Sequence, residues 1–245
     1  MFQPRTYRQL IADHHLISFH VTVKETDVRI SARTDLSCRA RERILACRGY
    51  LEAYTQTHPE FRNTLVPWPV SGPMPRIVRD MANAGGLAGV GPMAAVAGAV
   101  AEDVGLDLLK VSEEVIVENG GDIFVRLHRP FTSAIYAGAS PLSLRVGLRI
   151  DAGGQPLALC TSSGTFGHSL SRGKADAVCV IARSCPLADA AATAVGNRVA
   201  APKSISQAMA FGQSIPGILG IVIIVDDKIG AWGDGDVMSL IDRSN

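Results

Sequence analysis

The stretch that decides the fold runs from Asn83 to Arg126 and opens with Ala84-Gly85-Gly86-Leu87-Ala88-Gly89-Val90-Gly91. The next residue, Pro92, fits the first turn of a helix, where its missing N–H costs nothing. Apolar residues recur at helical spacing from Met93 to Val104, and most positions between them are Ala or Gly. The pattern predicts a glycine-rich loop followed by a closely packed helix. Such a helix start can bind phosphate, but glycine loops before helices are often simple turns, and both readings stay open.

The segment Asn119-Gly120-Gly121-Asp122-Ile123 lies between two runs of strand-forming residues. Asn-Gly between such runs is a strong signal for a tight hairpin. We expect Gly120 and Gly121 to adopt backbone angles that other residues reach only at a cost. Asp122 leaves this turn either as a turn-capping residue or as a side chain that faces a ligand.

A second Ala-rich helix is predicted from Ser184, a plausible N-cap, to the stop signal Gly196-Asn197. Asp189 and Thr193 are four residues apart and therefore project from one face of this helix. Its other positions are small or apolar, and an unpaired buried charge is costly. A hard cation such as Mg²⁺ would satisfy both oxygens. Alternatively, Asp189 is an early-turn acid that the helix dipole favours.

Four short motifs, in the same order along the chain, resemble those of ApbE-type flavin transferases. Gly85-Gly86-Leu87-Ala88 is similar to their Gly-Gly-Ile-Ala step, and Asn119-Gly120-Gly121-Asp122-Ile123 to their Asn-x-Gly-Gly-Asp-Ile signature. Thr161-Ser162-Ser163-Gly164 is similar to their Ser-Thr-Ser-Gly segment. Ala188-Asp189-x-x-x-Thr193 matches their Ala-Asp-x-x-x-Thr. The chain therefore resembles a shorter branch of the ApbE-like superfamily.

This resemblance implies a site for FAD or a related flavin nucleotide with Mg²⁺, between a glycine-rich loop and two helices. The family holds its metal through a backbone carbonyl, an Asp and a Thr, which correspond here to Ala88, Asp189 and Thr193. The residues that would contact the nucleotide are Gly85, Gly86, Gly89, Asn119, Gly120, Gly121, Asp122, Ser162, Ser163 and Gly164.

The fold that the resemblance implies is α+β, of the T-fold type. It is a tandem of two strand–helix–strand halves with antiparallel sheets and central Ala-rich helices. The order of strand and helix patterns along the chain independently favours α+β over a doubly wound sheet. No linker separates the halves, so residues 1–245 are expected to form a single ApbE-like domain.

The departures from the family bear on activity. The transferases follow their Ser-Gly with a His-hydrophobic-hydrophobic-Asp-Pro-x-Thr-Gly block, and only His168 of that block survives here. His168 is the candidate catalytic base, although a lone His is more often a hydrogen-bonding core residue. The Lys-Gly that follows Gly-Gly-Ile-Ala is replaced by Gly89-Val90-Gly91.

We therefore expect nucleotide binding without classical FMN transfer. Two alternatives stay open: an active Mg²⁺-dependent FAD-processing enzyme or FMN transferase, and, as the resemblance implies, an accessory protein in sulfur assimilation that assists homocysteine formation.

The composition of the chain bears on whether it binds nucleic acid, a membrane or a small molecule. The chain has 245 residues, 47% hydrophobic and 19% charged, as is ordinary for a globular protein. A formal charge of +1 and 5% aromatic residues give no argument for nucleic acid or an anionic membrane. Residues Met1 to Asp13 lack the apolar core of a secretory signal, and no apolar run reaches the roughly 18–20 residues that span a bilayer. We expect a cytoplasmic protein with a small nucleotide ligand; a partner enzyme and a homo-oligomer stay open.

The remaining patterns concern single elements. Five cysteines without Cys-x-x-Cys argue against disulfides and zinc, and we favour small apolar core filling as their role. The alternative is a reactive thiol: Cys160 precedes the Thr-Ser-Ser-Gly segment, and Cys185 starts a helix, whose N-terminus lowers the pKa of a thiol. Leu36 to Thr57 predicts an amphipathic helix with a solvated arginine face, and Glu60 to Arg76 a proline-rich surface loop. Strand patterns occur near residues 19–23, 28–32, 133–137, 142–150, 157–161, 175–182, 217–225 and 228–232, and a short helix pattern at 202–211.

Overall fold

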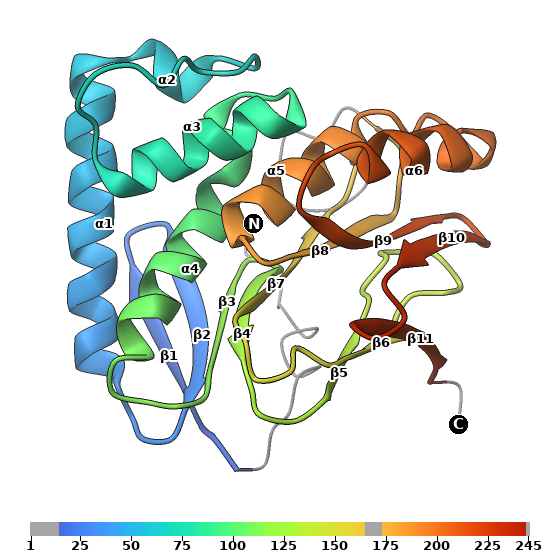
Figure 1. The fold of residues 1–245 in the computed structure, drawn as a ribbon, viewed down its shortest axis with the longest axis horizontal. Helices are drawn as coiled ribbons and strands as arrows, with labels where there is room; N and C mark the ends of the chain where they lie inside the picture. The colour runs from blue at the N-terminus through green and yellow to red at the C-terminus, as the bar shows by residue number, and fades with distance from the viewer. Residues whose placement is uncertain (1–14, 165–172, 244–245) are drawn as a thin grey trace.

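The structure, a computed structural model, describes residues 15–164 and 173–243. Within these ranges eight antiparallel strands form the main sheet, in the order β1-β2-β3-β4-β7-β8-β9-β10 (Figure 1). A second sheet has the order β11-β6-β5. The strands are β1 (Ile17–Val23), β2 (Thr26–Ala32), β3 (Val115–Asn119), β4 (Asp122–Arg126), β5 (Phe131–Ala134), β6 (Val146–Ile150), β7 (Leu157–Ser162), β8 (Ala177–Ala182), β9 (Ile218–Val225), β10 (Lys228–Gly233) and β11 (Met238–Asp242).

The helices gather on one face of the main sheet, and the small sheet lies against part of the other face (Figure 1). The helices are α1 (Ser37–Thr57), α2 (Glu60–Asn63), α3 (Arg76–Ala88), α4 (Val96–Leu108), α5 (Cys185–Gly196) and α6 (Ile205–Gln213), with 3₁₀ turns η2 (Pro92–Ala95) and η3 (Pro202–Ser204). Strand β8 shows how both faces are used. Val178 and Val180 pack under the helices, whereas Cys179 and Ile181 pack toward the small sheet. Alternation along a strand thus supplies two cores from one apolar run.

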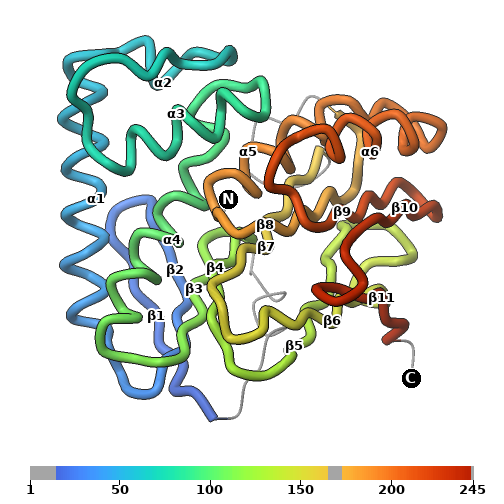
Figure 2. Tube along the Cα trace, viewed as in Figure 1, coloured from blue at the N-terminus to red at the C-terminus, as the bar shows by residue number. Residues whose placement is uncertain are grey.

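This arrangement confirms the predicted α+β fold with antiparallel sheets and Ala-rich helices. Each half of the chain gives two strands, a central helix and two strands: β1-β2, α4, β3-β4, and then β7-β8, α5, β9-β10. The halves occupy opposite ends of the main sheet, as the colour gradient in Figure 2 shows, and they meet where β4 pairs with β7. Central helix α4 packs on β3 and β4, and α5 packs on β7 and β8.

The predicted glycine loop, Ala84 to Gly91, is wrong for its first five residues, because α3 continues to Ala88. Gly85 and Gly86 belong to the last turns of α3, and only Gly89, with φ of 73°, forms the left-handed C-cap. The apolar face made by Ile77, Val78 and Met81 is buried, and this burial outweighs the helix-breaking tendency of the glycines. A Cβ on Gly85 would lie 2.7 Å from the Val90 carbonyl oxygen, so glycine is needed where the chain reverses.

The arginine face of α1 is also more than a solvated surface. The Arg39 and Arg43 guanidinium groups bind Asp107 and Asp103 of α4 with shortest N–O distances of 2.7 and 2.6 Å. Packing of α1 on α4 brings these acids into reach, and no pattern within α1 could indicate them. The segment after Pro59 also contains α2, and the sequence patterns did not indicate β11.

No single helix in the described part of the chain is long and apolar enough to cross a membrane. Helix α3 and the run Pro92–Leu108 reach that length and composition only together, and they are bent by 105°.

Close packing of α4 on the sheet gives a test of the fold. A Cβ on Gly105 would lie 2.1 Å from the Phe124 ring, and Phe124 is buried. Gly105→Ala should therefore lower the free energy of unfolding by about 1–3 kcal/mol, as overpacking does. The control is Gly49→Ala on α1, where nothing lies within 4 Å, so the same change should stabilise. Urea unfolding of both variants measures the difference, and equal effects would contradict the packing described.

Candidate functional site

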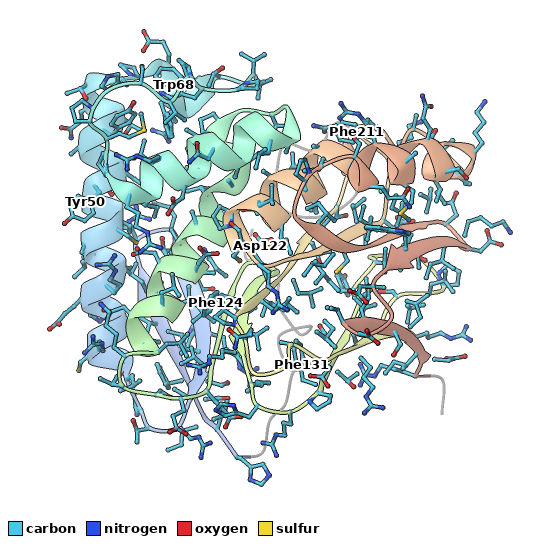
Figure 3. All side chains as sticks on the ribbon, in the orientation of Figure 1. Tyr50, Trp68, Asp122, Phe124, Phe131 and Phe211 are labelled. Atoms are coloured by element: carbon cyan, nitrogen blue, oxygen red, sulfur yellow. The ribbon has the colours of Figure 1, made fainter. Side chains whose placement is uncertain are left out.

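Polar side chains gather on the helix-facing side of the sheet, where the two halves meet. Asn119 and Asp122 flank the β3–β4 turn, and they share this side with Val117 and Phe124 by strand alternation. Cys160 and Ser162 lie on the same side of β7. Asp122 lies where β4 passes α5 (Figure 3). The sheet therefore presents polar groups directly beneath the two central helices.

The β3–β4 turn has the predicted geometry. Gly120 and Gly121 have φ values of 69° and 110°, which confirms that both positions favour glycine. The Gly121 N–H donates to Glu118 Oε1 at 2.9 Å. The Asn119 amide Nδ2 donates to the Ala97 carbonyl at 3.0 Å. Asn119 therefore ties the hairpin to the first turn of α4.

Asp189 reaches the N-terminus of α4 from α5. The N-cap position of α4 is Ala95, which has no side chain able to cap, and Asp189 Oδ2 accepts from the Gly98 N–H at 2.9 Å. A Cβ on Gly98 would lie 2.5 Å from the Cys185 carbonyl oxygen and 2.9 Å from Asp189 Cβ. Only glycine permits this approach. The dipole that Asp189 contacts thus belongs to α4 and not to its own helix.

Helix α5 is exposed at only two positions. Every residue from Cys185 to Gly196 is buried except Asp189 and Thr193, which are partly exposed. Helix α3, whose last residue is Ala88, packs against α5. Asp189 and Thr193 are therefore the two residues of α5 at which a ligand could reach this helix. Convergence of the Ala88 carbonyl with these two oxygens stays a prediction.

The carboxylates of the site are poorly solvated. Burial raises the pKa of Asp122 to about 7, although the Cys160 thiol and the Thr161 N–H donate to it. Burial, and then the charge of Asp122, raise the pKa of Asp189 well above its ordinary value, against the N–H groups of Gly98 and Ala97. No Lys or Arg of the described residues is among the groups that shift these pKa values. A divalent cation would supply the missing positive charge.

Cys160 and Cys185 fill the core, as the favoured interpretation of the cysteines predicts, and the alternative of a reactive thiol at Cys185 is wrong. Cys185 and Cys160 are fully buried with their Sγ atoms 3.5 Å apart. Burial raises the pKa of Cys185 to about 11, so desolvation outweighs the dipole of α5. Both thiols belong to the core beneath the site, as small apolar residues would.

The Thr-Ser-Ser-Gly segment ends β7. Ser162 is buried, and its Oγ has no hydrogen-bond partner within the described ranges. The Gly164 N–H donates to the Ala175 carbonyl, and a Cβ on Gly164 would collide with the Gly173 carbonyl. Ser163 is partly exposed. The candidate base His168 lies outside the described residues.

Sequence reasoning missed Glu102. Its Oε2 accepts from the Cys185 N–H at 2.6 Å, which ties α4 to the first residue of α5. The available signal was an acid inside the apolar run Val96–Val104.

The structure also contains a cavity apart from this site, and the grouping of acidic and thiol side chains in the described chain bears on metal binding. A cavity of about 270 Å³ is lined by Ala139, Ser140, Pro141, Asp176, Asp226 and Asp227, on other elements. Within residues 15–164 and 173–243, no three His, Cys, Asp or Glu side chains are grouped to hold a metal by themselves. The predicted metal set contains only one such side chain, Asp189, with a hydroxyl and a backbone carbonyl.

The chain is similar to known proteins in sequence and in fold. A family model described as "AbpE bacteria" matches residues 8–229. UPF0280 proteins of two archaea are similar: that of Methanosarcina barkeri is 40% identical over 220 residues, covering 89% of this chain and 87% of the relative. That of Methanocaldococcus jannaschii is 40% identical over 219 residues, covering 87% and 89%.

Two solved structures share the fold. The flavin transferase ApbE from Vibrio cholerae aligns with a TM-score of 0.57 at 15% identity, covering 90% of this chain and 97% of that one. The apo flavinyl transferase ApbE from Pseudomonas stutzeri aligns with a TM-score of 0.61 at 15% identity, covering 90% and 95%.

The burial of Asp122 predicts a pH dependence. Because its folded pKa is about 7 against an ordinary 3.8, the folded state binds this proton more tightly than the unfolded chain does. Its contribution to stability is present at low pH and is lost as pH rises from about 4 through 7. Asp122→Asn should remove this loss, so wild type should weaken relative to the variant by up to a few kcal/mol across the range.

Urea unfolding from pH 4.5 to 8, with a chelator to remove metal, measures the effect. The control is Asp227→Asn, an exposed acid whose pKa Lys228 lowers, so its small difference should have the opposite sign. A pH-independent difference between wild type and Asp122→Asn would contradict the burial argument.

Proposed function

Because the chain belongs to the family described as "AbpE bacteria", we propose that it binds FAD, or a closely related flavin nucleotide, together with Mg²⁺. The flavin transferase fold supports a flavin-related function. The observation that carries the finer proposal is the exposure of α5, which is buried everywhere except at Asp189 and Thr193. A helix that hides all its other residues and opens only at two hard oxygens suits a cation–phosphate ligand.

The metal would be held by the Ala88 carbonyl, the Asp189 carboxylate and the Thr193 hydroxyl. Bound Mg²⁺ would neutralise the charge of the pyrophosphate. Burial disfavours the charged forms of Asp122 and Asp189, and none of the described Lys or Arg side chains shifts their pKa values. A bound cation would therefore stabilise both carboxylates. The donor set is all oxygen, which is the chemistry that Mg²⁺ prefers.

The nucleotide would lie over the β3–β4 turn and the end of β7. Around the position that a Cβ would take on Gly120 there is open space for at least 4 Å, so a ligand can approach the turn backbone. Ser162 Oγ is buried without a partner in the described chain, and a ligand oxygen would satisfy it. Asn119 already binds Ala97, so we infer that it serves the site by holding α4 in place.

The first test is ligand-induced stabilisation. FAD with Mg²⁺ should raise the melting temperature, and either one alone should do so less, because a ligand that binds only the folded state stabilises it. Asp189→Asn should abolish the Mg²⁺-dependent part while keeping an oxygen that can cap α4. The control is Asp107→Asn, which loses an ion pair with Arg39 away from the site and should keep the full ligand response. Wild type that responds to none of FAD, FMN or ADP with Mg²⁺ would refute the proposal.

The second test concerns covalent transfer. The block that follows Ser-Gly in the transferases is missing here except for His168, so we predict binding with little or no FMN transfer. Purified protein is incubated with FAD, Mg²⁺ and a flavin-acceptor protein, and in-gel fluorescence reports any covalent flavin. Fluorescent acceptor that disappears with His168→Ala would show that the chain is an active transferase.

A further inference from the structure

Glu102 binds the start of the helix that carries the proposed metal ligands. Its Oε2 lies 2.6 Å from the Cys185 nitrogen and accepts that N–H. The N-cap of α5, Ser184, accepts from Leu187 at 3.5 Å and so serves a different N–H. The first N–H groups of a helix have no partner within the helix. Glu102 therefore supplies, from α4, a cap that α5 does not provide for itself.

The two central helices cap each other. Glu102 of α4 accepts from the first residue of α5, and Asp189 of α5 accepts from Gly98 in the first turn of α4. Between them, Gly98 and the Cys185 backbone approach so closely that no Cβ fits. Moving either helix along its axis would break both hydrogen bonds. The position of the Asp189 carboxylate thus depends on the contact that Glu102 makes.

The energetic cost of Glu102 argues against a role in stability alone. Burial is the largest influence on its pKa and raises it, and the nearby carboxylates of Asp80 and Asp103 raise it further, against the Cys185 N–H and Arg76. Helix α5 is already held by packing, because all its residues except Asp189 and Thr193 are buried. A partly desolvated acid among other acids is a poor way to stabilise a helix that packs so well. Such local costs are typical of functional sites.

We propose that Glu102 is a positioning residue, which fixes the first turn of α5 so that Asp189 and Thr193 present their oxygens to Mg²⁺. The proposal rests on the proposed flavin–Mg²⁺ site and deepens it. In this proposal Glu102 contacts the Cys185 N–H and neither the nucleotide nor the cation. It acts as the hydrogen-bonded supports of metal ligands generally do, by fixing where the ligand side chain points.

Three variants test this role. Glu102→Ala removes the acceptor, Glu102→Gln keeps an oxygen acceptor without the charge, and Asp103→Asn is the matched control. Asp103 is the next residue of α4 and binds Arg43 of α1 at 2.6 Å, so its loss should weaken packing of α1 without touching α5. Fluorescence titration of FAD in the presence of Mg²⁺ gives the affinity, hydrogen exchange gives the protection of the Cys185 amide, and urea unfolding gives stability.

Glu102→Ala should weaken Mg²⁺-dependent FAD binding about tenfold, the lower end for loss of a support to a metal ligand. It should also lose protection at Cys185, whereas Glu102→Gln should stay within about threefold of wild type and keep that protection. Asp103→Asn should lower stability at unchanged affinity.

Wild-type affinity in Glu102→Ala would overturn the positioning role while leaving the flavin site intact, as would a protected Cys185 amide in that variant. Affinity that falls in all three variants in parallel with stability would overturn it too. Titration of wild type tests the proposed function separately. If wild type does not bind FAD with Mg²⁺, both the proposed function and the positioning role are overturned.

Discussion

The arrangement of the molecule depends on one contact, where the first turns of α4 and α5 cross. Gly98 lies against the Cys185 carbonyl with no room for a side chain. This approach lets the Asp189 carboxylate bind the Gly98 N–H and the Glu102 carboxylate bind the Cys185 N–H. The Ala-rich composition of both helices follows, because larger side chains would separate them from each other and from the sheet.

This crossing concentrates negative charge in a region with little water. Asp122 comes from the sheet, Asp189 from α5 and Glu102 from α4, and burial raises the pKa of all three. Backbone N–H groups relieve part of that cost, as the helix starts do for Asp189 and Glu102. The remainder is a stability cost, which the proposed cation would offset on binding, so stability and the proposed function oppose each other here.

Elements that depend on local residue spacing could be predicted from the sequence. Features that depend on contacts between distant residues could not. The hairpin at Gly120 and Gly121 follows from turn chemistry, and α5 from its caps and spacing. The motifs also located Asn119, Asp122 and Asp189 beside one another in the fold. The glycines at the end of α3 predict a loop, because glycine content carries no information about the apolar face that this helix buries. The hydrogen bonds of Asp189 and Glu102 join residues that are far apart in the chain, so only the packed helices reveal them.

The candidate site lies at the centre of the main sheet because each half of the chain supplies part of it. The first half supplies α4 and the β3–β4 hairpin, and the second supplies β7 and α5. Because β4 pairs directly with β7, α4, which packs on β3 and β4, lies against α5, which packs on β7 and β8. Each helix obtains a cap from the other half of the chain, Asp189 for α4 and Glu102 for α5. Neither half carries both the proposed metal ligands of α5 and Glu102, the residue proposed to fix their position, so the geometry of the candidate site requires both halves in one sheet.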